Sequence, residues 1–248
     1  MRIAIAGGTG VVGAPTVDAV QAAGHEAVIL ARSRGVDLLT GVGVDAALDG
    51  VDAVIDTLNV TTLSADAAVE FFTKATSNLI AASERAGVTH VVLLSIVGID
   101  RIPVDYYAGK LAQEKVVERS AVPWTIQRAT QFHEFAAQMF ARAKFGPLHL
   151  APRARTQPVA AAEVGERLAS LAAGAPQGRA RDFAGPREEA LDAMVKAYAK
   201  RAGYRGWVPS VSIPSAQMKG MREGLALPGP DADLGSQTFA DWLAARSA

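Results

Sequence analysis

Three glycines, Gly7, Gly10 and Gly13, each separated by two residues, follow directly on the short apolar segment 2–6. Segment 11–23 then has the apolar spacing of an amphipathic helix. Glycine lets the backbone turn tightly and approach a ligand closely, and the first amides of a helix, at the positive end of its dipole, bind anions. A strand, a glycine turn and a helix in this order predict a binding site for a pyrophosphate group. The alternative is an ordinary glycine-rich turn in another α/β protein.

Strand-like and helix-like segments alternate along the first half of the chain, which is typical of a parallel sheet covered by helices on both faces. Segment 88–94 is almost wholly apolar, as expected for a central strand. We therefore predict an α/β fold with a doubly wound, Rossmann-type parallel sheet. The predicted strands are 2–6, 27–31, 51–58, 88–94 and 124–128, and the predicted helices are 11–23, 65–85, 104–119, 132–143, 161–173, 188–203 and 239–243.

The stretch after the second predicted strand is too short for the usual connection. A further short strand is expected near 36–39, but only about five residues separate it from the strand at 27–31. A parallel crossover takes roughly a dozen residues or more. The second helix of the usual pattern is therefore missing or reduced to a loop, and the pairing of segment 36–39 stays open.

After Arg128 the alternation loosens, and prolines become frequent between 147 and 158 and again between 207 and 230. We predict a single NAD(P)-binding domain over 1–248. Residues 1–130 form its dinucleotide-binding core, and 131–248 supply mostly substrate-side elements as a small, irregular covering part.

Composition excludes several classes of partner. The formal net charge is zero and no basic stripe occurs, so no nucleic acid is expected. The chain has no cysteine, and its four histidines are not spaced as metal ligands, so no metal is expected. A core strand begins at residue 2 and no apolar run reaches membrane-spanning length, so we expect a soluble, cytoplasmic protein that does not bind membranes. A small molecule is the expected partner, and the oligomeric state is not indicated.

Arg32 directly follows the second predicted strand, and Ser33 and Arg34 come next. In doubly wound sheets this position contacts the adenosine ribose of a dinucleotide: a carboxylate suits the free hydroxyl of NAD, and an arginine suits the 2′-phosphate of NADP. The guanidinium group is a permanently charged, bidentate donor. The sequence therefore predicts NADP(H) in preference to NAD(H). A solvated arginine at a strand end is the alternative.

Polar side chains also follow the later strands. Segment 57–59 closes one of them, and Ser95 closes the next, at the edge where ligands of such sheets lie. Tyr106 and Lys110 are four residues apart and share one face of the predicted helix, where a lysine ammonium would lower the pKa of the phenol. Ser95, Tyr106 and Lys110 then suit hydride transfer, with Tyr106 as proton donor. An exposed Tyr–Lys helix face is the alternative, and Tyr107 is a weaker candidate. No convincing pair of acidic residues is found. Strand-edge and solvated-helix positions are the expected roles of Asp52, Asp56, Glu114 and Glu118.

These motifs resemble the short-chain dehydrogenase/reductase superfamily. Segments 93–98 and 124–129, with the tyrosine pair, resemble its atypical, NmrA-like NAD(P)H-binding branch, and the resemblance is closest over 1–135. It implies that Asn78 completes a proton relay and that the residues after the strand at 124–128 lie near the nicotinamide. Members of this branch usually have a proline and a small residue there, whereas this chain has Ala129 and Thr130. Many members lack a working tyrosine and act as sensors.

The predicted site has three parts. The catalytic candidates are Ser95, Tyr106, Lys110 and Asn78, and the substrate-side candidates are Gln131, Phe132 and His133, of which the histidine could equally be a core residue. The predicted cofactor contacts are Gly7, Thr9, Gly10, Val11, Val12, Gly13, Arg32, Ser33, Thr57, Leu58, Asn59, Lys110, Ala129 and Thr130.

Three functions fit these residues. The leading hypothesis is an NADPH-dependent oxidoreductase that transfers hydride to a small carbonyl or quinone. The second is a non-catalytic NADP(H)-binding sensor that regulates a partner. The third is a nucleotide-sugar epimerase, which the short C-terminal part makes less favourable.

Overall fold

The structure is a computed structural model, and it describes residues 1–246. Its centre is a parallel sheet with the strand order β14-β11-β5-β4-β3-β1-β2, to which β10 adds beside β5. The direction of strand order reverses between β1 and β3, as in a doubly wound sheet. The sheet strands are β1 (Arg2–Ala6), β2 (Glu26–Leu30), β3 (Ala53–Asp56), β4 (His90–Ile96), β5 (Trp124–Ala129), β10 (Gly178–Arg179), β11 (Phe183–Ala184) and β14 (Asp233–Leu234).

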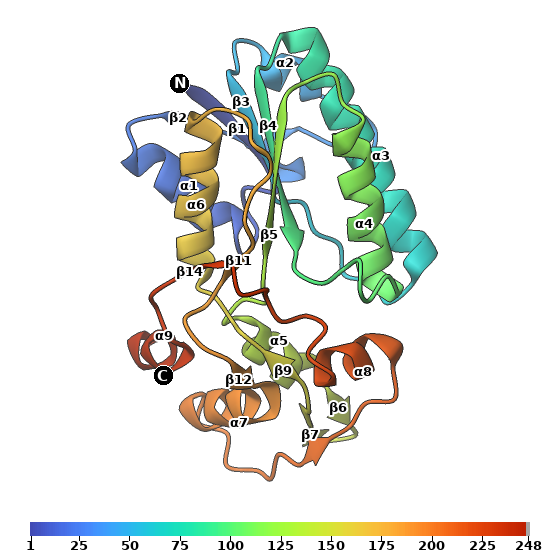
Figure 1. Cartoon of the computed structure of the whole chain (residues 1–248), viewed down its shortest axis with the longest axis vertical. Helices are drawn as coiled ribbons and strands as arrows, with labels where there is room; N and C mark the ends of the chain where they lie inside the picture. The colour runs from blue at the N-terminus through green and yellow to red at the C-terminus, as the bar shows by residue number, and fades with distance from the viewer. Residues whose placement is uncertain (247–248) are drawn as a thin grey trace.

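Helices cover both faces of the sheet (Figure 1). On one face lie α1 (Gly13–Ala22) and α6 (Ala161–Ala173), which pack on alternate strand residues such as Ile5, Ile55 and Val92. On the other face lie α2 (Val44–Leu48), α3 (Ala65–Ala86) and α4 (Asp105–Glu118). Strands buried on both faces explain the nearly continuous apolar sequence of β4. The predicted α/β class with a Rossmann-type parallel sheet is confirmed.

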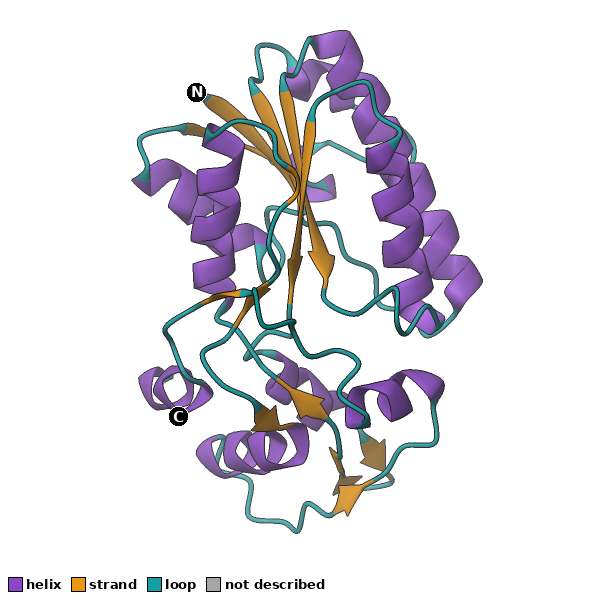
Figure 2. Cartoon of the chain, in the orientation of Figure 1, coloured by secondary structure: helices purple, strands orange, loops and turns teal. Residues whose placement is uncertain are grey.

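A smaller lobe lies beyond the carboxyl ends of β4 and β5 (Figures 1 and 2). Its helices are α5 (Phe135–Arg142), α7 (Leu191–Arg201), α8 (Ala216–Arg222) and α9 (Phe239–Ala245). Its short strands are β6 (Lys144–Phe145), β7 (Leu148–His149), β8 (Ala151–Pro152), β9 (Arg155–Thr156), β12 (Glu189–Ala190) and β13 (Ser210–Val211), which the sequence did not predict. This lobe faces the ligand edge of the sheet.

The strand expected near 36–39 is absent, and that prediction was wrong. After β2 the chain forms a short 3₁₀ turn (η1, Arg32–Arg34) and reverses at Gly35, whose φ is +78°. Val36 and Leu38 are buried against α3 instead of pairing with β2. The five residues available could not carry the chain back for parallel pairing, so β2 remains an edge strand of the sheet.

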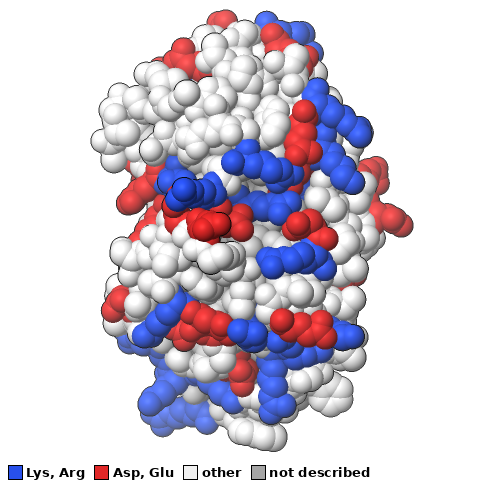
Figure 3. Space-filling view, in the orientation of Figure 1, with Lys and Arg blue, Asp and Glu red and all other residues white. Residues whose placement is uncertain are grey.

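Charges are distributed without a dominant sign over the middle of the molecule. Figure 3 shows Lys and Arg interspersed with Asp and Glu across this face. Several of these side chains form ion pairs, among them Arg128 with Glu114 and Arg167 with Asp233. Within residues 1–246, the structure holds no helix that is both long and apolar enough to cross a membrane.

Candidate cofactor and active site

The glycine loop joins β1 to α1 with its backbone tightly folded. Gly7 has a φ of +74°, and the amide of Gly10 donates to the Gly7 carbonyl at 2.8 Å. A Cβ added at Gly13 would overlap this carbonyl oxygen and would lie 2.7 Å from its carbon. Thr9, Gly10 and Val11 are exposed at the tip of the loop. The start of α1 thus packs on the loop too closely for any side chain at position 13, as expected of the glycine cradle of a pyrophosphate site.

The end of β2 lies beside this loop, because the amide of Gly7 donates to the Leu30 carbonyl at 3.2 Å. Arg32, Ser33 and Arg34 follow in the exposed 3₁₀ turn. Neither arginine has an ion-pair partner within the described residues. Two cations and a hydroxyl next to the cradle fit a phosphate on the adenosine ribose.

The turn after β3 also contacts the glycine loop. The amide and the hydroxyl of Thr57 both donate to the Ala6 carbonyl, at 3.0 and 2.7 Å. The Thr57 carbonyl oxygen lies 3.0 Å from the position that a Cβ on Gly7 would take. Leu58 is half-buried and Asn59 is exposed. The structure therefore brings the predicted contacts at 57–59 together with those at 7–13.

Tyr106 lies in the first turn of α4, at the same edge of the sheet. Its hydroxyl donates to Oδ1 of Asn59 at 2.8 Å, and its ring packs edge-on against Phe72 with 5.6 Å between the ring centroids. The residue before it, Asp105, has a φ of +49°, a strained conformation for a residue with a side chain. Burial raises the pKa of Tyr106, and Tyr107 and Asp56 raise it further. The phenol is therefore held in its protonated form.

Lys110 lies one helical turn from Tyr106 but is turned toward the sheet. Its Nζ donates to the Leu94 carbonyl at 2.8 Å and to Oε1 of Gln113, and it lies 4.9 Å from the centre of the Phe72 ring. Burial lowers the pKa of Lys110 to about 8, against the opposing effect of nearby carboxylates. The expected lowering of the Tyr106 pKa by this ammonium is not found, because burial of the phenol dominates.

Within the described residues, no hydrogen bond joins the Ser95 side chain to Tyr106 or Lys110, although Lys110 donates to the carbonyl of the neighbouring Leu94. It is inside β4 rather than at its end, and its side chain is buried on the α4 side of the sheet. Its Oγ has no well-formed hydrogen bond within the described residues. The nearby carboxylate is Glu114: burial acts to raise the pKa of Glu114, but the hydrogen bonds and charge of Arg128, with a hydrogen bond from Arg179, lower it overall. The structure thus buries the Ser95 side chain, and its contact with a substrate oxygen stays a prediction.

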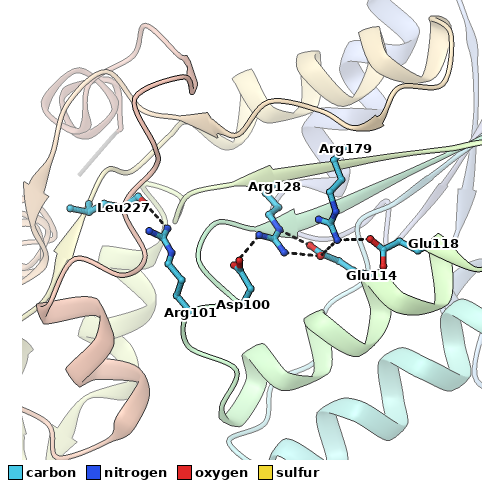
Figure 4. A network of polar contacts seen from close by, with 7 residues as sticks. All are labelled: Asp100, Arg101, Glu114, Glu118, Arg128, Arg179 and Leu227. Atoms are coloured by element: carbon cyan, nitrogen blue, oxygen red, sulfur yellow. Dashed lines mark hydrogen bonds and ion pairs between the residues drawn. The ribbon is translucent and has the colours of Figure 1, made fainter.

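Glu114 is the centre of an ion-pair network (Figure 4). Arg128 binds both of its carboxylate oxygens, at 2.9 and 2.8 Å, and also contacts Asp100 at 2.9 Å. Arg179 donates to Glu114 at 2.9 Å and to Glu118 at 2.6 Å. The interpretation of Glu114 as a solvated helix residue was therefore wrong: its side chain is fully buried and joins α4 to β5 and β10.

The side chains of Asn78 and Thr130 donate hydrogen bonds to backbone carbonyls of nearby loops. The amide of Asn78 donates to the carbonyls of Leu38 and Leu39, at 2.8 and 3.2 Å. It therefore holds the loop at 36–39, where a strand had been expected. Within residues 1–246 it makes no hydrogen bond to Ser95 or Tyr106. Ala129 is buried at the end of β5, and the Thr130 hydroxyl donates to the Gln157 carbonyl at 2.5 Å.

The three substrate-side candidates are more enclosed than the sequence indicated. Gln131 is buried between the hydroxyls of Tyr107 and Thr156, at 3.2 and 2.8 Å. Phe132 packs on the core shared by α1 and α6. His133 is fully buried beneath α9, where its Nε2 lies 3.1 Å from the Gln237 carbonyl and its ring contacts Phe239 and Trp242. His133 is thus in a core environment, and burial lowers its pKa.

Sequence reasoning missed three polar residues beneath the site: Asp56, Thr76 and Gln113, all fully buried and hydrogen-bonded together. Asp56 had been interpreted as a strand-edge residue. Two signals were available. Asp56 ends an apolar strand, and Gln113 lies three residues after Lys110 and so on the same helix face.

Comparisons with known proteins agree with this geometry. A family model described as NAD(P)H-binding matches residues 7–173, so the chain belongs to this NAD(P)H-binding family. The predicted membership of an NAD(P)H-binding family is confirmed. A search of the curated proteins finds no match.

Solved structures show the same fold at low sequence identity. The NADPH-dependent quinone oxidoreductase of Escherichia coli, complexed with NADPH, has a TM-score of 0.74 and 17% identity, with 98% of each chain covered. The triphenylmethane reductase of Citrobacter sp., complexed with NADP(H), has a TM-score of 0.69 and 16% identity, with 93% of each chain covered. UDP-N-acetylglucosamine 4-epimerase from Bacillus cereus has a TM-score of 0.69 and 17% identity, with 98% of this chain and 95% of the other covered. The chain therefore shares its fold with these reductases and with this epimerase.

Proposed function

We propose that the protein is an NADPH-dependent reductase of small carbonyl or quinone compounds. The observation that carries this proposal is the hydrogen bond between Tyr106 and Asn59, which places a protonated phenol at the edge of the sheet that bears the glycine loop. A reductase needs a proton donor at this edge, because the oxygen of its substrate gains negative charge as hydride arrives.

The remaining residues have roles in binding. The glycine loop and the first amides of α1 suit the pyrophosphate, and Arg32 with Ser33 suits the 2′-phosphate of NADP(H). When bound, this cofactor supplies the hydride. Tyr106 gives a proton to the substrate oxygen. Lys110 has three N–H donors, of which Leu94 and Gln113 accept two, and we assign the third to the ribose of the nicotinamide half.

The named activities of two similar structures support the proposal. One is a quinone oxidoreductase complexed with NADPH, and the other is a triphenylmethane reductase complexed with NADP(H). Another similar structure is complexed with NAD, so the preference for NADP(H) in this chain depends on Arg32.

The test is NADPH consumption by the purified protein with a panel of quinones and aldehydes, followed at the absorbance of the reduced nicotinamide. We expect turnover with at least one compound and a loss of about 100-fold in kcat for Tyr106→Phe, since general acid catalysis contributes about that much or more. Tyr107→Phe is the matched control, because the Tyr107 hydroxyl is buried against Gln131. Equal rates for wild type and Tyr106→Phe would remove Tyr106 from the mechanism.

The burial of Ser95 favours a second candidate function, a non-catalytic NADP(H) sensor. A reductase of the expected type would hold the substrate oxygen with this hydroxyl, and here Ser95 lies on the α4 side of β4 near Glu114. A sensor would bind NADPH without turnover of any panel compound. Binding measured by the fluorescence of NADPH, together with the turnover assay, separates the two functions.

A further inference from the structure

The buried carboxylate of Asp56 is the meeting point of three elements beneath the candidate site. Its Oδ1 accepts a hydrogen bond from the Leu58 amide at 2.9 Å, within the turn after β3. Its Oδ2 accepts from the amide of Gln113 on α4 at 2.9 Å and from the hydroxyl of Thr76 on α3 at 3.2 Å. One side chain therefore ties the turn that carries the predicted cofactor contacts to α3 and α4 on this face of the sheet.

Gln113 links the charge of Asp56 to the charge of Lys110. Its Nε2 donates to Asp56, and also to Thr76 at 2.9 Å, while its Oε1 accepts from the Lys110 ammonium. A carboxylate only accepts and an ammonium only donates, so a single orientation of the amide satisfies both partners. Gln113 therefore bridges the Asp56 carboxylate and the Lys110 ammonium, which are not in direct contact.

Both groups are almost wholly buried. Asp56 is fully buried and Lys110 is 3% exposed, and buried charges are costly unless they are paired and hydrogen-bonded. The charged and titratable groups that act on Lys110 and Asp56 are these two residues themselves, Glu114 on α4 and Tyr106 at the start of that helix. Among the groups that favour the charged form of Lys110, Asp56 has the largest effect and Glu114 follows.

We propose that Asp56 is a positioning residue of the reductase site, acting through Leu58 on the turn that binds the cofactor and through Gln113 on Lys110. The proposal rests on the function proposed above. The turn also carries Asn59, the acceptor of the Tyr106 hydroxyl, and Lys110 lies one helical turn from Tyr106 on α4. The Asp56 carboxylate thus helps to position Tyr106 in two ways, through the turn that carries Asn59 and through helix α4.

The test reads the titration of Lys110 directly. Lysine labelled with ¹³C at the ε-carbon is followed by NMR against pH, and the Lys110 signal is assigned by its absence in Lys110→Arg. Asp56→Asn keeps the side-chain shape and an acceptor for Leu58 but removes the charge. We expect the Lys110 midpoint to fall by about one pH unit or more, as for the loss of a nearby opposite charge. The alkaline limb of NADPH turnover should move with it, because Lys110 is needed in its charged form.

Two further variants distinguish a loss of the Asp56–Lys110 coupling from a general loss of stability. Thr76→Val removes a hydroxyl from the same network without changing a charge, so it should leave the Lys110 midpoint in place even where it lowers stability. Gln113→Leu breaks the link itself and should lower the midpoint as Asp56→Asn does, and it serves if that variant does not fold. An unchanged midpoint in folded Asp56→Asn or Gln113→Leu would overturn the proposal. A shifted midpoint in a protein without turnover would overturn the reductase function and leave the coupling of Asp56 to Lys110 standing.

Discussion

The Tyr106 hydroxyl donates to Oδ1 of Asn59 at 2.8 Å, which joins the first turn of α4 to the turn after β3. Because the two residues come from elements that flank the predicted cofactor site, the position of the phenol depends on this bond. Asn59→Ala should lower kcat by roughly fivefold, the equivalent of one ordinary hydrogen bond of about 1 kcal/mol. It should have almost no further effect in Tyr106→Phe, since both changes remove the same contact. Steady-state kinetics of the two single variants and the double variant give the comparison, and additive losses would contradict it.

The exposed arginine after β2 leads to a prediction about cofactor choice. Arg32→Ala should weaken NADPH binding by about 10- to 100-fold, because a hydrogen bond to a charged group contributes about 1.5–3 kcal/mol, and should leave NADH binding nearly unchanged. Arg119→Ala, in which an exposed arginine at the far end of α4 is removed, is the matched control. Fluorescence titration with both nucleotides measures the effect, and equal affinity of the wild type for the two would rule out recognition of the 2′-phosphate.

The close approach of Gly13 to Gly7 predicts a steric cost. In Gly13→Ala the new methyl group meets backbone atoms of Gly7 and Gly8 that cannot move independently of β1. We expect a loss of about 1–3 kcal/mol in the free energy of unfolding, typical of overpacking, together with loss of dinucleotide binding. Gly229→Ala has no atom within 4 Å of the new Cβ and should behave as wild type. Urea denaturation of both variants checks this difference.

Glu114 predicts a pH-dependent contribution to stability. Its pKa is lowered in the folded state, so its contribution is complete above its unfolded pKa of about 4.5 and is lost as pH falls through the folded value. Glu114→Gln should cost about 3 kcal/mol at neutral pH, the lower end for a broken buried pair, because Arg128 keeps Asp100 as a partner. Its stability should then change less than that of wild type in acid.

The matched control for Glu114 is Asp45→Asn, which breaks the exposed pair between Asp45 and Arg85. An exposed pair is screened by solvent, so its loss should be much smaller than that of Glu114. Thermal unfolding of wild type and both variants between neutral and acidic pH measures the difference. Equal losses in the two variants would mean that the Glu114 network contributes no more than a surface ion pair.

The parts of the site that lie close together in sequence could be predicted. The glycine loop, the first helix and the position of Arg32 follow from short-range rules, and the structure brings 7–13, 32–33 and 57–59 to one edge of the sheet. A shortened connection after β2 could also be foreseen from the five residues available, and the structure has only the five-residue helix α2 before β3. The same reasoning still placed a short strand near 36–39, because Val36 and Leu38 are as apolar as strand residues although they pack on α3.

The orientation of Ser95 could not be predicted. In β4 both faces are buried, so apolar residues alternate with apolar residues and the pattern does not show which side chains face α4. The role of Asn78 could not be predicted for a similar reason: the sequence does not show whether its helix presents it to the active site or to the 36–39 loop. Asp56 and Gln113 are 57 positions apart, and only the packing of α4 against α3 and the central sheet brings them together.

Helix α6 has a consequence for synthesis of the chain. It comes from residues 161–173, yet it covers the face of the sheet formed by strands that begin at residue 2. While the ribosome makes the first 160 residues, Ile55 on β3 and Val92 on β4 lack the cover of α6 and expose an apolar surface. The nucleotide-binding half therefore completes its folding only after α6 emerges, and a product truncated before α6 would be prone to aggregation.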